Sequence, residues 1–197
     1  MQHDDRLIVA LDFPTLEQAK NCVLELGETV SHYKVGMELY YAVGSEIIRF
    51  LKEQGKEVFL DLKLQDIPNT VAHALTVLSD LGADMMNVHS VGGKKMMSEA
   101  VKAVREAAEK AGKPAPKLIA VTILTSMDDE QFGDLNYKNT IAEQVIALAK
   151  LAKEAGVKIE EDRKITDKVV RRFADNEELA HLEQQLFRYP SKTYEGE

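Results

Sequence analysis

A short segment near the middle of the chain places two carboxylates and an ammonium group close together. Asp61, Lys63 and Asp66 stand in the run Asp-Leu-Lys-Leu-Gln-Asp, directly after the apolar residues Val58-Phe59-Leu60. Ionised groups that leave water cost several kcal/mol each unless they are paired. Charges at the end of an apolar segment therefore predict a reactive site more strongly than an incidental ion pair.

The apolar residues before this segment are typical of a buried strand in a parallel sheet. Side chains alternate between the two faces of a strand, so Phe59, Asp61 and Lys63 should share one face. The leucines at 60, 62 and 64 should share the other face and pack under helices. The pattern predicts charged side chains that face an interior.

Residues capable of chemistry also occur at other apolar segments. Asp12 follows one, Lys34 lies in the next, and His89, Thr122 and Thr125 stand at later ones. Sites in parallel α/β folds are built at the carboxyl ends of the strands. We expect an array of alternating charge, formed by Asp12, Lys34, Asp61 and Lys63. Such an array keeps both lysines protonated and both carboxylates ionised. Alternation further predicts that Lys34, Gly36 and Glu38 share one strand face.

The rest of the chain alternates between short apolar runs and stretches with helical periodicity. Strands are predicted at Leu7–Phe13, Tyr33–Leu39, Glu57–Leu64, Met85–Ser90 and Leu118–Leu124. Helices are predicted at Thr15–Leu26, Ser45–Gln54, Pro68–Leu81, Gly93–Ala111 and Thr140–Ala155, each closed by a nearby glycine. Five β/α units predict a parallel sheet, either doubly wound or the start of an eight-stranded barrel.

Composition limits the classes of function. The chain has 197 residues, 45% of them hydrophobic, one cysteine and a net charge of -8. A single cysteine and an amino terminus without a signal-peptide pattern favour a cytoplasmic protein. The acidic balance argues against nucleic-acid or membrane partners, and no apolar run is long enough to span a bilayer. The five scattered histidines offer no metal-ligand spacing, so we expect no metal site.

The β/α pattern stops after Val157. Residues 158–197 are densely charged, and their apolar residues recur at helical spacing. We therefore expect two parts: a partial (β/α) barrel with the reactive motif at 1–157, and a tail of two amphipathic helices at 158–197.

Several motifs together resemble the orotidine 5'-phosphate decarboxylase family of the bacterial type, from about Leu7 to Val157. They are Ile8-Val9-Ala10-Leu11-Asp12-Phe13, Lys34-Val35-Gly36-Met37-Glu38-Leu39, the run from Phe59 to Thr70, Asn87-Val88-His89, Gly92-Gly93 and the run from Ala120 to Ser126. The resemblance implies a (β/α)8 barrel of the TIM type, of which this chain holds the first five units. It also implies a homodimer with a shared active site, and decarboxylation of orotidine 5'-phosphate to UMP without a cofactor.

The resemblance implies a role for each matching residue. Lys63 would donate the proton, and Asp61 would face the leaving carboxylate. Lys34 and Asp12 would order the ribose and the array of charges. Asp66, Ile67 and Thr70 would contribute to the site across the dimer. Thr125 and Ser126 would contact the pyrimidine.

The tail departs from the family, and two other readings stay open. The family's phosphate-gripping Gly-Arg pair is absent after Val157, and the strands at the two ends of the sheet would remain open edges. One alternative is a related sugar-phosphate barrel of the hexulose-phosphate synthase or keto-gulonate-phosphate decarboxylase type, which uses magnesium. The other is a truncated or fused remnant without activity.

Overall fold

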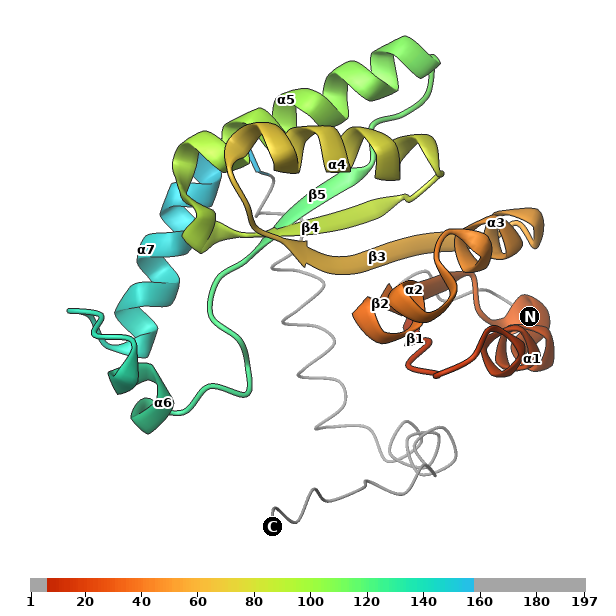
Figure 1. The fold of residues 1–197 in the computed structure, drawn as a ribbon, viewed down its shortest axis with the longest axis horizontal. Helices are drawn as coiled ribbons and strands as arrows, with labels where there is room; N and C mark the ends of the chain where they lie inside the picture. Colours follow the sequence, from red (N-terminus) through yellow and green to blue (C-terminus); the bar gives the residue numbers. More distant parts are fainter. Residues whose placement is uncertain (1–6, 158–197) are drawn as a thin grey trace. The chain divides into compact units, whose positions relative to one another are not determined.

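The computed structural model describes residues 7–157, and the two tail helices expected at 158–197 lie outside these residues. Five parallel strands form one sheet: β1 (Ile8–Ala10), β2 (His32–Gly36), β3 (Glu57–Leu64), β4 (Met85–His89) and β5 (Lys117–Val121). Their order in space is the same as their order in the chain (Figure 1). A doubly wound sheet reverses its strand order at a switch point, whereas successive barrel strands always move to the next position. The order therefore matches the wall of a barrel.

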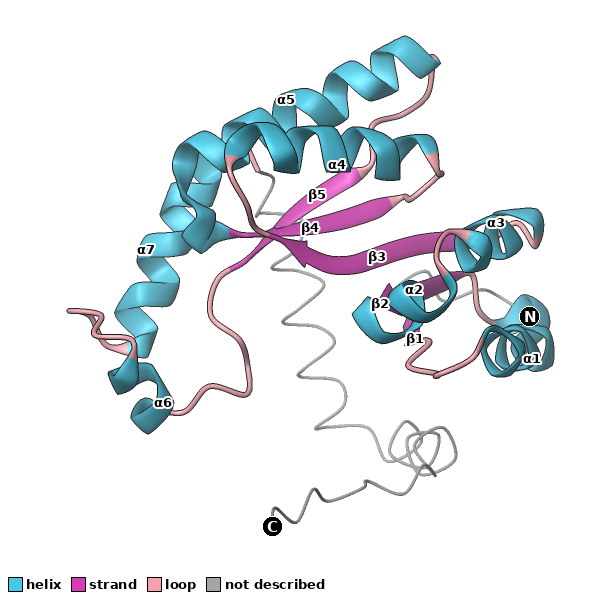
Figure 2. Cartoon of the chain, in the orientation of Figure 1, coloured by secondary structure: helices cyan, strands magenta, loops and turns pink. Residues whose placement is uncertain are grey.

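Helices follow the strands, as the sequence pattern predicts. The main ones are α1 (Leu16–Leu26), α3 (Glu46–Glu53), α4 (Pro68–Asp80), α5 (Gly93–Ala111) and α7 (Ile141–Glu154). Figure 2 shows α4 and α5 lying along the same side of β3, β4 and β5. Thr15 caps the start of α1 by accepting a hydrogen bond from the Gln18 N–H, and α5 ends at Gly112 in the left-handed conformation.

The two faces of the sheet differ in burial. The parallel registers align Val35, Leu60 and Met86 on one face, and all three are fully buried in the hydrophobic core beneath the helices. The alternate positions, including Lys34, Phe59 and Asp61, point to the opposite face and are half-buried. The predicted alternation is thereby confirmed along residues 59–61, before the strand becomes irregular near Lys63. The helices of residues 7–157 cover the leucine face and leave the charged face only partly covered.

The second predicted strand is too long. β2 ends at Gly36, and Met37–Val43 forms the helix α2. Glu38 therefore lies on a helix, and its predicted place on the strand face beside Lys34 is wrong. Short apolar runs satisfy both strand and helix periodicity, which is why the pattern alone misplaced this boundary.

Other boundaries differ less. The first and fifth strands end at Ala10 and Val121, which leaves Asp12 and the residues around Thr125 in loops. A short helix, α6 (Asp129–Asp134), follows β5 and is capped by the Asp128 side chain. Two 3₁₀ turns, η1 (Gly27–Thr29) and η2 (Ser90–Gly92), complete the described elements.

Candidate functional site

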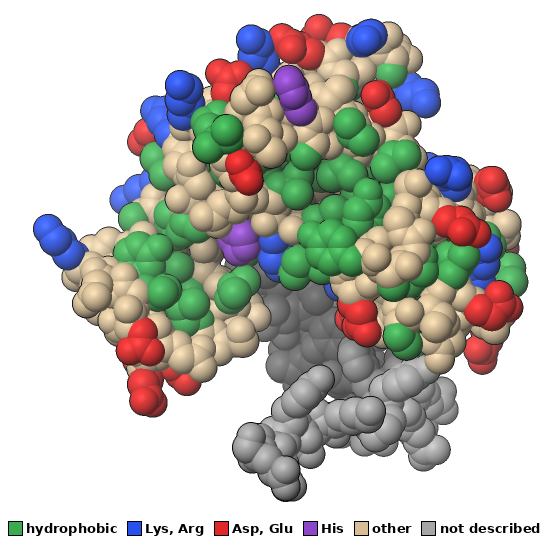
Figure 3. Space-filling model, in the orientation of Figure 1, with side chains coloured by type: hydrophobic (Ala, Val, Ile, Leu, Met, Phe, Trp, Pro, Cys, Tyr) green, Lys and Arg blue, Asp and Glu red, His purple; other side chains and the backbone are tan. Residues whose placement is uncertain are grey.

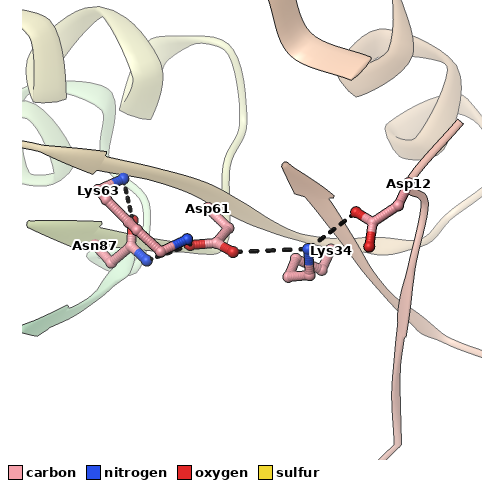
Figure 4. A network of polar contacts seen from close by, with 5 residues as sticks. All are labelled: Asp12, Lys34, Asp61, Lys63 and Asn87. Carbon is pink, nitrogen blue, oxygen red and sulfur yellow. Dashed lines mark hydrogen bonds and ion pairs between the residues drawn. The ribbon is translucent and has the colours of Figure 1, made fainter. Parts of the chain in front are cut away.

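Four charged side chains form a continuous array across the first three strands. Lys63 Nζ lies 2.6 Å from Asp61 Oδ1, and Lys34 Nζ lies 3.6 Å from the other oxygen of Asp61. Lys34 Nζ also donates a hydrogen bond of 3.2 Å to Asp12 Oδ1 (Figure 4). The order Asp12, Lys34, Asp61, Lys63 alternates in sign, as predicted. Each lysine is held between or beside carboxylates at the carboxyl end of the sheet.

Asp61 is the most enclosed member of the array, with 13% of its side chain exposed. Burial by itself raises its pKa, but hydrogen bonds from Lys63 and Asn87 and the positive charges of Lys63 and Lys34 act in the opposite direction. The net result is a pKa below the ordinary value of an aspartate. Asp61 is therefore ionised at neutral pH despite its burial.

The outer end of the array is more open. The side chain of Asp12 is 63% exposed, and that of Lys34 is 24% exposed. Gly36 lies beside this pair: a Cβ at that position would stand 3.4 Å from both Asp12 Oδ1 and Lys34 Nζ. The absence of a side chain at Gly36 leaves room for the Lys34–Asp12 contact.

Lys63 has an unusual backbone conformation, with φ of 51°. A residue with a Cβ rarely adopts this left-handed region. The pairing of β3 with β4 also changes register here, because Leu60 pairs with Met86 while Leu64 pairs with Val88. Such a β-bulge redirects a side chain next to the irregularity. In this structure the redirected residue is Lys63.

Asn87 is a site residue that the sequence reasoning quoted as part of a motif without giving it a role. Its side-chain oxygen accepts a 2.7 Å hydrogen bond from the Lys63 backbone N–H, and its side-chain nitrogen donates a 2.6 Å bond to Asp61 Oδ1 (Figure 4). It is only 3% exposed. An asparagine inside an apolar strand is disfavoured on propensity, and that local conflict was the available signal.

The other predicted site residues lie apart from the array. These other residues are Asp66, Ile67, Thr70, Thr125 and Ser126. Within residues 7–157, none of the five forms a hydrogen bond or ion pair with the four charged residues of the array. All five are exposed, and Asp66 accepts a 2.6 Å hydrogen bond from the Ile67 N–H in the loop before α4. Thr125 and Ser126 lie in the loop after β5.

His89 ends β4 close to the array. Burial lowers its pKa, and the positive charge of Lys63 lowers it further against the opposing effect of Asp61. The imidazole is therefore neutral at pH 7 and adds no charge to the array.

The described residues contain neither a cluster suited to a metal ion nor a helix suited to a membrane. No cluster of three or more histidine, cysteine, aspartate or glutamate side chains in residues 7–157 could hold a metal ion. No helix in that part of the chain is long and apolar enough to cross a membrane.

Two solved structures have a similar fold. A crystal structure of orotidine 5'-phosphate decarboxylase from Lactobacillus acidophilus matches with a TM-score of 0.71 and 43% identity, over 77% of this chain and 68% of that chain. An uncharacterized conserved protein from Geobacillus kaustophilus matches with a TM-score of 0.72 and 46% identity, over 76% of this chain and 70% of that one.

Curated relatives that are similar in sequence carry the same name as the Lactobacillus acidophilus structure. An orotidine 5'-phosphate decarboxylase of Streptococcus mutans is 51% identical over 156 residues, and one of Carboxydothermus hydrogenoformans is 50% identical over 153 residues. Each alignment covers 78% of this chain but only 64% and 63% of the relative, so the chain spans less than two thirds of their length. The model of the orotidine 5'-phosphate decarboxylase / HUMPS family matches residues 5–183, which extends past Val157. The chain belongs to the orotidine 5'-phosphate decarboxylase / HUMPS family.

Proposed function

We propose that this chain carries the catalytic array of a decarboxylase that converts orotidine 5'-phosphate to UMP, with Lys63 as the proton donor. The single observation that carries the proposal is the alternating array, in which Lys63 Nζ lies 2.6 Å from the half-buried, ionised Asp61. The relatives named as orotidine 5'-phosphate decarboxylases, at about half identity, support the same reaction.

The array suits a reaction that develops negative charge on carbon. When the bond between C6 of the pyrimidine and its carboxylate breaks, CO2 leaves and the bonding electron pair stays on C6. The Lys63 ammonium stabilises this charge and delivers its proton to C6, after which solvent restores the ammonium. Asp61 stands beside the departing carboxylate, so its repulsion of the substrate disappears as CO2 leaves.

The remaining predicted residues are proposed to bind the substrate. Lys34 and Asp12 have the charges and the partial exposure needed to hydrogen-bond ribose hydroxyls while they order the array. Thr125 and Ser126 are exposed in the loop after β5, at the same edge of the sheet, where their hydroxyls are free to contact the pyrimidine.

We also propose that the protein acts as a homodimer with shared sites. Asp66, Ile67 and Thr70 make no hydrogen bond or ion pair with the described charges of their own protomer, yet they follow the reactive strand directly. Ile67 is 67% exposed, and Val77 on α4 is 59% exposed. Figure 3 shows hydrophobic side chains gathered in the middle of one face, with charged ones mainly along its rim. A second copy would supply Asp66 to the partner's array.

The test is the loss of orotidine 5'-phosphate absorbance with the purified 197-residue chain, with and without EDTA. We expect turnover that resists EDTA and disappears in Lys63→Ala, while circular dichroism shows an unchanged fold. Activity of more than a few per cent in the variant would exclude Lys63 as the proton donor.

Two other outcomes identify the alternative functions. Activity that EDTA abolishes and magnesium restores, measured on a sugar-phosphate substrate, would place the chain with the magnesium-dependent members of this group of barrels. A folded chain without turnover on either substrate would identify a non-catalytic member of the family.

A further inference from the structure

We propose that Asn87 is a positioning residue, which holds the Lys63 backbone and the Asp61 carboxylate in their reactive arrangement. The inference rests on the proposed function, because it concerns the same array. Asn87 does not touch the substrate in this scheme and acts through its two neighbours.

The first step of the argument is the irregular pairing between β3 and β4. The register runs from Leu60 opposite Met86 to Leu64 opposite Val88, so β3 has more residues than β4 in this interval. A bulge leaves backbone groups of the longer strand without ladder partners. The Lys63 N–H is such a group, and the Asn87 side-chain oxygen accepts its hydrogen bond at 2.7 Å. The carboxamide thus replaces a backbone carbonyl.

The second step is the direction of the carboxamide. The backbone N–H of Lys63 requires an acceptor, and the ionised Asp61 requires a donor. Asparagine supplies both from one planar group, with the nitrogen 2.6 Å from Asp61 Oδ1. Because the two bonds orient each other, the amide cannot rotate without losing both. Asp61 Oδ1 then accepts hydrogen bonds from Asn87 Nδ2 and from Lys63 Nζ at the same time.

The third step links this geometry to Lys63. Its positive φ of 51° is a conformation that a lysine adopts only when its surroundings impose it. The bond to the buried Asn87 is a contact that fixes the Lys63 N–H in this conformation. Without that bond we expect the bulge to relax and the Lys63 ammonium to leave its place beside Asp61.

The first experiment compares Asn87→Ala with the parent protein and with Ser90→Ala. Ser90 is a suitable control because it is fully buried, directly follows the same strand, and loses one hydrogen bond, from its Oγ to the Val121 carbonyl. We expect kcat to fall by about 10- to 100-fold in Asn87→Ala with little change in KM. A kcat that matches that of Ser90→Ala would overturn the proposal.

The second experiment uses the isosteric variant Asn87→Asp. This variant keeps an acceptor for the Lys63 N–H but places a second carboxylate next to that of Asp61. The other titratable groups that face the site are Lys34 from β2, Lys63 from β3 and His89 from β4. A proton shared by the two carboxylates restores the donated bond and the original charge. Activity relative to the parent should therefore rise as the pH falls, whereas a ratio that does not change with pH would contradict this role.

A third measurement does not depend on turnover. In a carbon-detected NMR titration, we expect the Asp61 carboxyl to titrate at higher pH in Asn87→Ala than in the parent, since one donor is lost. If the parent shows no turnover, the proposed function fails, and this titration still decides the role of Asn87. An unchanged Asp61 titration would overturn the inference whatever the activity.

Discussion

At the scale of single residues, Asp61 organises the site. One of its oxygens accepts two hydrogen bonds of 2.6 Å each, from Lys63 Nζ and from Asn87 Nδ2. Its other oxygen forms an ion pair with Lys34 Nζ at 3.6 Å. Donors and positive charges around a half-buried carboxylate favour its charged form. The two lysines in turn remain fixed because the carboxylate stays ionised.

The lowered pKa of Asp61 makes a prediction about stability. A group whose pKa is depressed by folding stabilises the folded state above its unfolded pKa, and this contribution is lost as the pH falls through the folded value. We expect Asp61→Asn to be less stable than the parent at neutral pH, and the difference to shrink from about pH 4 downward. Urea unfolding of both proteins at several pH values measures this difference. A difference that stays constant down to about pH 3 would show that the charge of Asp61 does not contribute to folding.

The sequence predicted the charged residues of the site better than the uncharged one. Asp12, Lys34, Asp61 and Lys63 were identifiable because ionised side chains in apolar strands require partners. Asn87 carries no charge, and its proposed role depends on a β-bulge that no residue type in the sequence predicts. The left-handed Lys63 was equally hidden, since such positions are usually marked by glycine.

At the scale of elements, the irregular strand β3 places the Lys63 ammonium beside Asp61. Regular alternation brings Asp61 to the accessible face, and the bulge near Lys63 brings its ammonium back onto the same carboxylate. The price of this geometry is a strained backbone at Lys63.

This strain makes a prediction about the free energy of unfolding. Lys63→Gly should be more stable than Lys63→Ala by about 1 kcal/mol, because only glycine adopts a positive φ without steric cost. Denaturant unfolding of the two variants measures the difference. As a control, Glu57→Ala should be more stable than Glu57→Gly at the exposed start of the same strand. The same order at both positions would mean that Lys63 is not strained.

The element boundaries show the limits of pattern reading. The third strand was predicted with the bounds that it has, Glu57–Leu64, because its charged end and flanking glycine leave little ambiguity. The apolar run after Lys34 fits a strand or a helix, and packing made it the start of α2. The short helix α6 is not among the predicted helices, although the Asp128 cap and the acidic first turn are helix-start signals in the sequence.

At the scale of the whole molecule, the order of the strands places one part of the array on each successive strand. Asp12 follows β1, Lys34 lies in β2, Asp61 and Lys63 lie in β3, and Asn87 lies in β4. Asp66 stands beyond this set, which is why a second protomer is proposed to bring it in.

The proposed shared site can be tested by mixing inactive variants. Lys63→Ala and Asp66→Ala should each be inactive, but refolding them together should restore about a quarter of the parent activity, because half of the random dimers contain one intact site. Turnover of orotidine 5'-phosphate measures the recovery.

The matched control mixes Lys63→Ala with Asp61→Ala. Both residues come from the same protomer's strand, so every mixed site lacks one of them and no activity should return. Equal recovery in the two mixtures, or none in either, would contradict a site shared in this way.

β3 lies in the middle of the described sheet, so the two ends of the array are carried by strands in different positions. Local opening begins where a sheet has unpaired edges, and β1 and β5 are the outer strands among residues 7–157. Lys63, Asp61 and Asn87 are carried by inner strands, whereas Asp12 lies beyond the end of the short outer strand β1. We therefore expect the Asp12 end of the array to open more readily than its Lys63 end, so an entering ligand should displace Asp12 before it reaches Lys63.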